Sequence, residues 1–452
     1  MKCKRISRRL FLRATGSASI LAVLGACAPT PTAQPAAPQA TAVEATPPAA
    51  APGQAQPEYD LSNPKEVGRA LEAEGAEVSI SSWGFSGLPE THFIPRFAEL
   101  TKELYGVPVK LNWVTGVIDE AFRELPAAGK TVADIGLDVV DKEEDMFDAA
   151  MALEWYEPID MDIYKPLLPN LTLVEEPYIF RGPQENGGDI YGAVYQGYEW
   201  LQPILRKDKV DVANYVDWTD LARPELRDKI IDYPFNDRRG HFVFAGLVNS
   251  LVKQDLVPGP TFSQEAWEGA LQWWKDNEME KQIHKWGDIG NDPTMRLMLQ
   301  SGEAWAACTW GVYTRELLGT DWNKRDDVLW PFYPKSGMLA DRETCSAVRR
   351  AKHPVAARIL INWMLSIEFN TAGWYKEPGS TEAVNRWGIT ESLFLVTYTG
   401  GVYQAMRDAM PDWAKPYYPE DPGSLVLKMD WKWYNQNAEW IAKTYERIVH
   451  GA

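Results

Sequence analysis

The chain has 452 residues, of which 45% are hydrophobic and 24% charged, and this is the composition of an ordinary globular protein. Its formal net charge is −17, and the first 26 residues contain six basic residues and no acidic one, so the remainder carries about −23. Nucleic acids and anionic membrane surfaces attract proteins of the opposite sign, so we expect no nucleic-acid partner.

The first 26 residues have the order of an export signal, a basic region followed by an apolar one. The apolar residues 17–26 are about half the roughly 20 residues that span a bilayer, so we do not expect a transmembrane helix. Residues 7–13 contain Arg8 and Arg9 and resemble a twin-arginine signal. Residues 24–27 resemble the lipobox of bacterial lipoproteins, so we expect a lipid on Cys27 that anchors the exported protein to the outer face of the cytoplasmic membrane.

The segment after the predicted lipidation site has the composition of a disordered tether. Residues 28–57 contain eight prolines and one charged residue, Glu44, so they cannot bury a core. We therefore assign residues 27–57 to the lipidated cysteine and its tether. The roughly 395 residues that follow exceed the size of a single core, about 250 to 300 residues, so we expect two lobes.

Strands and helices alternate after the tether. Residues 77–83 alternate as a strand, 89–105 have apolar positions at helical spacing, and 107–113 alternate again. This order predicts a parallel sheet covered by helices. Further strands are predicted at 134–140, 189–195, 229–232 and 304–310, and further helices at 142–153, 241–251, 264–277, 354–365 and 435–449.

Several short motifs then occur in one order along the chain. They are Ser82-Trp83, residues 217–221 with 224–230, Ser301-Gly302-Glu303 with Thr309-Trp310, Trp330-Pro331 with 334–337, and 351–357 leading into 361–365. In this order they resemble the extracellular solute-binding proteins (family 1) of bacterial ABC importers, in the branch that binds polyamines, iron or thiamine.

The resemblance implies an α/β, two-lobed periplasmic-binding-protein-like fold of type II, in which a ligand is held in a cleft between the lobes. We expect lobe 1 at 76–190 plus 340–395 and lobe 2 at 191–339 plus 396–452. The implied protein is a monomer that hands a small solute to a membrane permease. It needs no cofactor and is not an enzyme.

The same resemblance implies the binding residues. The positions that match the polyamine-binding members are Trp83, Glu143, Asp145, Asp237, Trp310, Asp341, Glu343, Trp431 and Trp433. Aromatic faces attract a desolvated ammonium and carboxylates supply its counter-charge, so the implied solute is cationic and polyamine-like. Two positions depart from the family: Gly240 replaces a second carboxylate, and Asp341 replaces a tryptophan.

Other interpretations of these residues stay open. Trp83 and Trp310 could pack in the core, and residues 141–145 could be a solvated helix start that the helix dipole stabilises. A neutral sugar is the alternative ligand, and a secreted carbohydrate-active enzyme is a further alternative, because carboxylates beside tryptophans also describe a glycosidase. Tyr417-Tyr418 lies too near the C-terminus to match the ferric-ion ligands of relatives, and the five histidines lack metal-ligand spacing, so we predict no metal site.

Two of the four cysteines remain after Cys3 leaves with the signal and Cys27 takes lipid. Outside the cytoplasm Cys308 and Cys345 could form a disulfide. Two buried free thiols are the alternative.

Overall fold

The structure is a computed structural model that describes residues 59–83, 87–174, 179–182, 188–235, 237–283, 292–310, 328–370 and 419–451, with short pieces at 374–376, 383–385, 404, 407–408 and 415. The predicted export signal, Cys27 and the tether up to residue 57 lie outside the described residues, as do Tyr417 and Tyr418. Among the described residues, no helix has the length and apolar character needed to cross a membrane.

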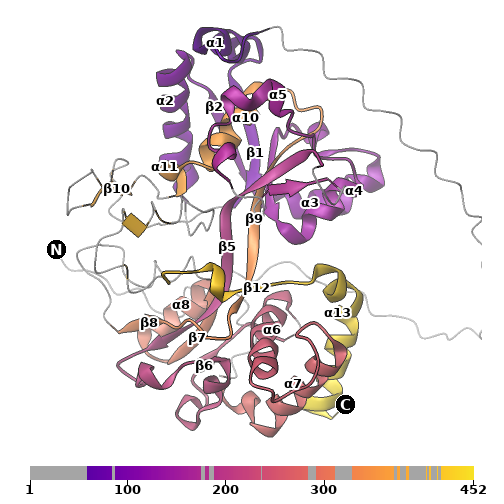
Figure 1. The fold of residues 1–452 in the computed structure, drawn as a ribbon, viewed down its shortest axis with the longest axis vertical. Coiled ribbons are helices and arrows are strands. Elements are labelled where there is room, and N and C mark those ends of the chain that lie inside the picture. The colour runs from indigo at the N-terminus through magenta and orange to yellow at the C-terminus, as the bar shows by residue number, and fades with distance from the viewer. Residues whose placement is uncertain are drawn as a thin grey trace, which may run out of the picture. The chain divides into compact units, whose positions relative to one another are not determined.

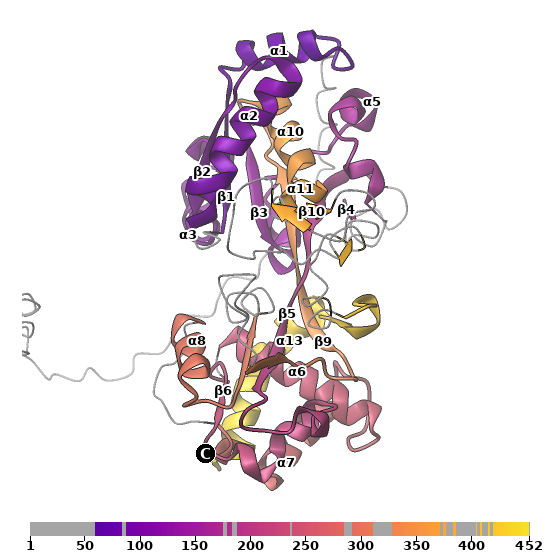
Figure 2. The same cartoon turned by 90° about the vertical axis from the view of Figure 1, so that its left-hand side faces the viewer.

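The first strands form a parallel sheet with helices packed against it (Figures 1 and 2). Strand β1 (Glu77–Ser82) lies between β2 (Lys110–Thr115) and β3 (Val139–Glu143), parallel to both. Around them are α1 (Pro64–Ala73), α2 (Ile94–Tyr105), preceded by a π-helical turn at Pro89–Phe93, and α10 (Pro354–Met364). The predicted strand–helix–strand unit is confirmed.

Local sequence explains where these helices begin and end. The side chain of Asn63 accepts a hydrogen bond from the N–H of Lys65 at the start of α1, and Pro64 occupies the first helical position, where the missing N–H costs nothing. Helix α2 ends at Gly106, whose φ of 80° lies in the left-handed region that glycine adopts without steric cost.

Two long strands continue the sheet beyond β3. Strand β9 (Met338–Ala347) is antiparallel to β3 and to β5 (Ile190–Arg206), and β5 is antiparallel to β7 (Ala306–Trp310). Figure 1 shows β5 and β9 running side by side. The strand order is β2-β1-β3-β9-β5-β7-β6, where β6 is Ile230–Ile231, so the expectation of a parallel sheet is only partly correct. Shorter strands pair with the two long strands: β4 (Ile179–Arg181) and β8 (Leu329–Pro331) with β5, and β12 (Val426–Lys428) with β9.

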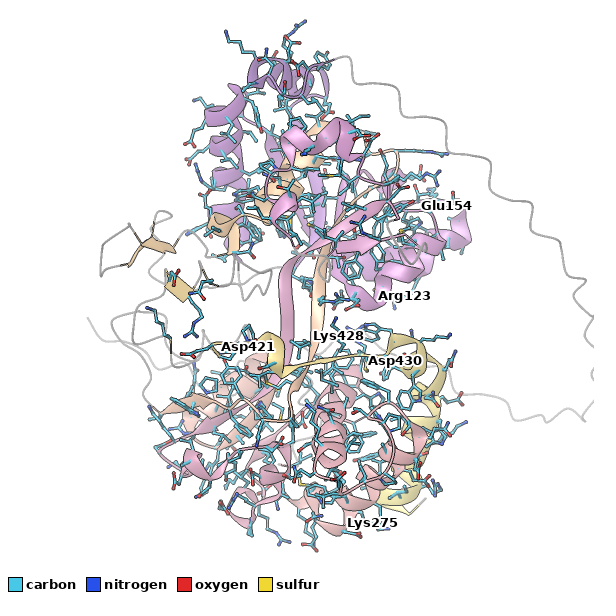
Figure 3. The ribbon with its side chains drawn as sticks, viewed as in Figure 1. Arg123, Glu154, Lys275, Asp421, Lys428 and Asp430 are labelled. Carbon is cyan, nitrogen blue, oxygen red and sulfur yellow. The ribbon has the colours of Figure 1, made fainter. Side chains whose placement is uncertain are left out.

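The helices of the second half begin at side-chain caps. Helix α6 (Arg238–Lys253) begins at Asp237, α7 (Gln264–Asp276) at Ser263 and α13 (Trp431–Tyr445) at Asp430. Each cap accepts a hydrogen bond from an N–H of the first turn, which has no partner within the helix. Figure 3 shows Lys428, at the end of β12, and Asp430 on the short connection into α13.

The remaining helices and strands are short or lie at the periphery. They are α3 (Val117–Glu124), α4 (Phe147–Ala152), α5 (Met161–Tyr164), α8 (Asp292–Ser301), α11 (Ile367–Asn370), β10 (Trp374–Lys376) and β11 (Ala383–Asn385). The helix predicted at 142–153 begins later than expected. Strand β3 runs to Glu143, a 3-10 turn follows at Glu144–Met146, and only then does α4 begin.

Among the described residues, buried apolar side chains form two large cores and a smaller one. The first core takes residues from 61–193 and 345–369, and the second takes residues from 201–340 and 434–448. The smaller core gathers residues 118–156 around Trp155, together with Val348. Strand β9 contributes Leu339 to the second core and Ala347 to the first, so it passes from one to the other. The first core starts at Leu61, earlier than the predicted lobe 1, and the exact lobe boundaries stay a prediction.

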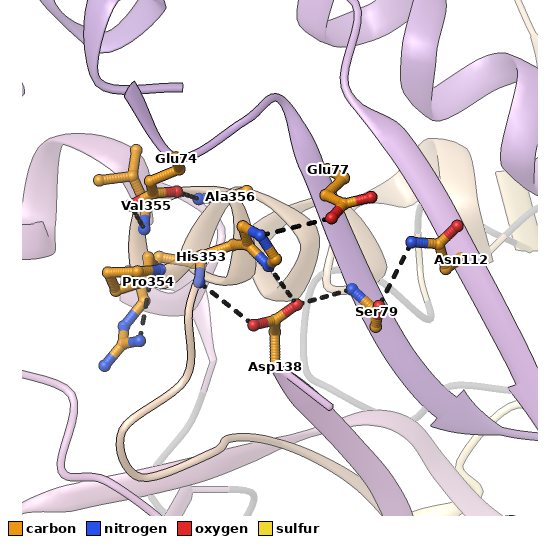
Figure 4. Close-up of polar contacts among 10 residues, drawn as sticks. Glu74, Glu77, Ser79, Asn112, Asp138, His353, Pro354, Val355 and Ala356 are labelled. Atoms are coloured by element: carbon orange, nitrogen blue, oxygen red, sulfur yellow. Dashed lines mark hydrogen bonds and ion pairs between the residues drawn. The ribbon is translucent and has the colours of Figure 1, made fainter. Parts of the chain in front are cut away.

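One buried polar network ties α10 to the parallel strands (Figure 4). Asp138, 1% exposed, accepts hydrogen bonds from the N–H of Ser79 at 2.8 Å and from the N–H and Nδ1 of His353 at 3.2 and 2.8 Å. The carboxylate of Glu74 accepts from the N–H groups of Val355 and Ala356 in the first turn of α10. Burial raises the pKa of Glu74 although these two hydrogen bonds oppose it. The network fixes the start of α10 against β1 and β3.

Cys308 and Cys345 are free and buried. The sequence left a disulfide or two buried thiols open, and the structure contradicts the disulfide and agrees with two thiols. Cys308 lies opposite Pro203 of β5, and Cys345 lies opposite Ala193. A strand rises about 3.3 Å per residue, and a bridge requires Cα atoms within about 7 Å, so the register places the two thiols too far apart. Burial raises the pKa of both thiols well above the usual value.

Candidate functional site

Three of the predicted binding residues lie together where β1, β3 and β9 meet. The indole Nε1–H of Trp83, the residue after β1, donates a hydrogen bond of 3.0 Å to Oε2 of Glu343 on β9. Glu343 lies directly opposite Glu143 in the β3–β9 pairing. Both glutamates are buried, at 8% exposure for Glu143 and 2% for Glu343. The fold therefore brings these three of the nine predicted residues together, and their contact with a ligand stays a prediction.

Lys142, which the sequence analysis did not select, completes this group. Its Nζ lies 4.5 Å from the centre of the Trp83 ring and 2.6 Å from Oε2 of Glu143. Its side chain is only 4% exposed. Two carboxylates on facing strand positions repel each other, and a buried charge needs a partner, so the lysine ammonium offsets the charge that the two glutamates bring into the sheet.

Arg238, at the start of α6, extends the group toward the second core. Its Nη2 lies 3.4 Å from Oε1 of Glu143, and its guanidinium carbon lies 5.8 Å from the ring centre of Trp431 and 5.2 Å from that of Phe242. Phe242 in turn meets Trp310 edge to face, with ring centres 6.4 Å apart. Lys142, Arg238 and Phe242 thus connect five of the predicted residues into one group. These five are Trp83, Glu143, Glu343, Trp310 and Trp431.

Asp237 has a structural explanation in this fold. It is the N-cap of α6, and its carboxylate accepts from the backbone N–H of Arg239 at 2.9 Å and from the Arg239 guanidinium at 3.0 and 2.7 Å. Partial burial raises its pKa, but the hydrogen bonds from Arg239 outweigh that effect, so the pKa of Asp237 lies below its usual value. Its predicted contact with a ligand stays a prediction.

The other predicted residues are placed as follows. Trp433 packs on Trp267 and Phe262 in the second core, with ring centres 5.4 and 5.9 Å apart. Asp145 lies in the 3-10 turn after β3, and Asp341 lies on β9 opposite Glu199. The side chains of Asp145 and Asp341 are outside the part of the chain that the structure describes.

A family model described as "Bacterial extracellular solute-binding protein" matches residues 88–385, about two thirds of the chain. The chain belongs to this family. Its α/β fold is the fold of periplasmic solute-binding proteins, as the sequence analysis predicted. No curated protein matches the chain.

Solved structures agree with this assignment at the level of the fold. The solute-binding protein resembles the spermidine/putrescine ABC transporter substrate-binding protein PotD of Streptococcus pneumoniae, with a TM-score of 0.54, 15% identity, and coverage of 82% of this chain and 99% of that one. It resembles an ABC transporter substrate-binding protein of Bradyrhizobium japonicum, with a TM-score of 0.55, 13% identity, and coverage of 82% and 99%. For a ferric binding protein of Campylobacter jejuni, the TM-score is 0.50, the identity 14%, and the coverage 82% and 99%.

These neighbours bind different solutes by name, so the polyamine-binding branch implied by the motifs is not distinguished from the iron-binding one. Within the described part of this solute-binding protein, no group of three or more histidine, cysteine, aspartate or glutamate side chains is arranged to hold a metal ion.

Sequence reasoning missed the two cations of the site. Lys142 lies within the acidic residues 141–145, where a basic residue on a predicted helix start carries no special signal. Arg238 directly follows Asp237, and an N-terminal arginine opposes the helix dipole, so its position is the one local signal that could have singled it out.

Proposed function

We propose that this solute-binding protein captures a small cationic amine for an ABC importer and does not catalyse a reaction. The solute is bound beside Trp83, Glu343, Trp310 and Trp431, where the chain passes between its first and second cores. A membrane permease then receives it. The sequence motifs favour a solute of the polyamine-like class.

The observation that carries the proposal is the environment of the Lys142 ammonium. It is held between the ring of Trp83, at 4.5 Å, and the carboxylate of Glu143, at 2.6 Å. An aromatic face and a carboxylate are the two groups that stabilise a desolvated ammonium, so this part of the fold is suited to cationic amines. The buried Glu343, hydrogen-bonded to the edge of the same ring, supplies a second carboxylate.

A neutral sugar is the alternative solute, and the charge of the site separates the two. A sugar ring stacks on tryptophan and donates hydroxyl hydrogen bonds, so it gains little from the formal charge of Glu343. A cationic amine gains from that charge directly, because truncating one partner of a buried charge pair costs about 2 to 5 kcal/mol. Replacing the carboxylate by an amide of the same shape therefore distinguishes the two solutes.

The experiment begins with thermal unfolding of the protein in a panel of polyamines, quaternary amines, sugars, thiamine and ferric ion. A ligand at 100 times its dissociation constant stabilises the folded state by about 2.7 kcal/mol. The solute identified is then titrated by calorimetry into the wild type and into Glu343→Gln. We expect a cationic amine, and a loss of affinity of at least tenfold in the variant.

The matched control is Glu439→Gln on α13, which removes the same charge from a side chain that is 83% exposed. It should keep wild-type affinity. Selection of a sugar with equal affinity in all three proteins would reject the cationic solute, and turnover of a glycan by a clean preparation would reject the binding function.

We propose further that the protein works outside the cytoplasm as a lipoprotein. This rests on the basic and apolar leader, the Arg8-Arg9 pair and the lipobox-like residues 24–27. Lipidation of Cys27 would hold the binding lobes beside the permease, at the end of a tether of about 30 residues. We propose that the protein is monomeric and that the solute closes the two lobes on each other.

A further inference from the structure

Trp83 is held in the structure at three points. Its indole Nε1–H donates to Oε2 of Glu343 at 3.0 Å, and its backbone carbonyl accepts a hydrogen bond of 2.8 Å from Nε1 of Trp113. Trp113 packs against the buried Phe93 of the first core, with ring centres 5.3 Å apart. The third point is the Lys142 ammonium, which lies over the ring, 4.5 Å from its centre. The edge, the backbone and one face of this tryptophan are thus each held by another part of the fold.

Lys142 is itself held in place. Its Nζ lies 2.6 Å from Oε2 of Glu143, and its side chain is only 4% exposed. A buried ammonium needs the carboxylate with which it is paired, so it stays at the ring face. Glu143 in turn lies directly opposite Glu343, which accepts the hydrogen bond of the Trp83 indole. Neighbouring positions of β3 and β9 therefore hold the indole, one at a face and the other at the edge.

This arrangement bears on how a solute can meet the ring. An indole has two faces, and Lys142 covers one of them. Trp83 is partly exposed, so a solute can stack only where the ammonium does not lie. A ring that already has its binding orientation loses little conformational freedom when the solute arrives, and this preorganisation strengthens binding.

We infer that Lys142 is a positioning residue, which holds the indole of Trp83 by one face so that the solute stacks on the opposite face. The inference rests on the proposed function, in which Trp83 contacts the solute, and adds the residue that orients this contact. Lys142 thereby affects affinity through the ring and not by touching the solute.

The orientation of the ring is tested without a solute. The full chain is labelled with 5-fluorotryptophan, and the fluorine NMR signal that Trp83→Phe lacks belongs to residue 83. In Lys142→Met, which keeps the stem of the side chain and removes the ammonium, this signal should broaden or split, because the ring then samples more than one orientation. A single signal of wild-type width in Lys142→Met would overturn the inference.

Two further variants separate positioning from a general loss of structure. Lys142→Arg should restore the sharp signal, because a guanidinium also pairs with a carboxylate and lies over an aromatic ring. Lys443→Met removes the same charge from a side chain on α13 that is 74% exposed, and it should leave the signal unchanged. Thermal unfolding checks that each variant is folded. Lys142→Gln, whose amide can still donate to Glu143, takes the place of Lys142→Met if that variant does not fold.

The effect on binding is measured by calorimetry with butane-1,4-diamine as the probe. The four proteins are wild type, Lys142→Met, Trp83→Leu and the double variant. Lys142→Met should weaken binding by about fivefold, which corresponds to about 1 kcal/mol. In the Trp83→Leu background the same change should cause no loss, because no ring remains to be held. If Lys142 acted on the solute directly as a like charge, its removal would tighten binding of the diamine in both backgrounds.

The outcomes separate the inference from the proposed function. An equal loss in both backgrounds, or tighter binding in both, would overturn the inference while the cationic function stands. If no amine of the thermal panel binds to the wild type, the cationic function fails, and with it the stacking of a cationic solute on Trp83. The fluorine signal still decides in that case whether Lys142 holds the ring.

Discussion

His241 should make the protein less stable as the pH falls from 6.5 to 4. The residue lies on α6 in the second core, 5% exposed, with its Nδ1 2.9 Å from the hydroxyl of Tyr434. The rings of Phe235 and Trp267 lie around it at 5.0 and 6.4 Å. Burial among these rings lowers the pKa of His241 from 6.5 to about 4, although the charge of Asp237 acts in the opposite direction.

The sign and size of the effect follow from this pKa. Below pH 6.5 the unfolded chain takes up a proton on His241, whereas the folded chain does not until the pH approaches 4, so acid favours the unfolded chain. One pKa unit corresponds to about 1.4 kcal/mol, so the full loss is about 3 kcal/mol, of which about 2 kcal/mol appears by pH 5. Typical proteins have only about 5 to 15 kcal/mol of stability in all.

The assay is denaturant unfolding of the wild type and of His241→Gln between pH 7.5 and 4.5. The variant should be less stable at pH 7.5, because it loses the packing of the imidazole ring, and the difference should shrink by about 2 kcal/mol at pH 5. The exposed His450 supplies the control variant His450→Gln, whose pH curve should run parallel to that of the wild type. Parallel curves for wild type and His241→Gln would show that the folded chain accepts the proton and would refute the reasoning.

Three further predictions test other parts of the protein. The variant Cys27→Ser should move from the membrane to the soluble fraction in cells, and its retention on membranes at high salt would contradict the lipoprotein assignment. Small-angle scattering at a saturating concentration of the identified solute should show a smaller radius of gyration, because closure brings both lobes onto it, and an unchanged value would contradict closure. Mass spectrometry after alkylation under non-reducing conditions should find Cys308 and Cys345 modified only once the protein is denatured, and a peptide containing both as a disulfide would disagree with the structure.

The fold was predicted from the sequence where the signal is local. Strand β1, helices α6 and α7 and strand β7 appear where the periodicity of the chain placed them, because each has an alternating or helical apolar pattern that its neighbours do not override. Strand β9 was not predicted, because its middle residues Asp341, Arg342 and Glu343 interrupt any apolar pattern. It forms because β3 and β5 offer their edges on its two sides, and such distant pairing leaves no local trace.

The candidate site shows the same division between local and distant information. Trp83 and Glu343 were selected separately from motifs 260 residues apart, and their hydrogen bond shows that the fold brings them together. The role of Lys142 could not be predicted from the sequence. There it is one basic residue among acidic ones, and the ring that it contacts is that of Trp83, which follows another strand.

The acidic residues of the site therefore do not indicate its solute by themselves. A count of carboxylates along the sequence favours a solute with several positive charges, because Glu143, Asp145, Asp341 and Glu343 are all acidic. In the fold Glu143 already meets Lys142 and Arg238, so cations of the chain itself offset part of the negative charge of these carboxylates. How strongly these carboxylates attract a cation therefore depends also on the cations that the chain itself supplies, and those contacts exist only in the folded sheet.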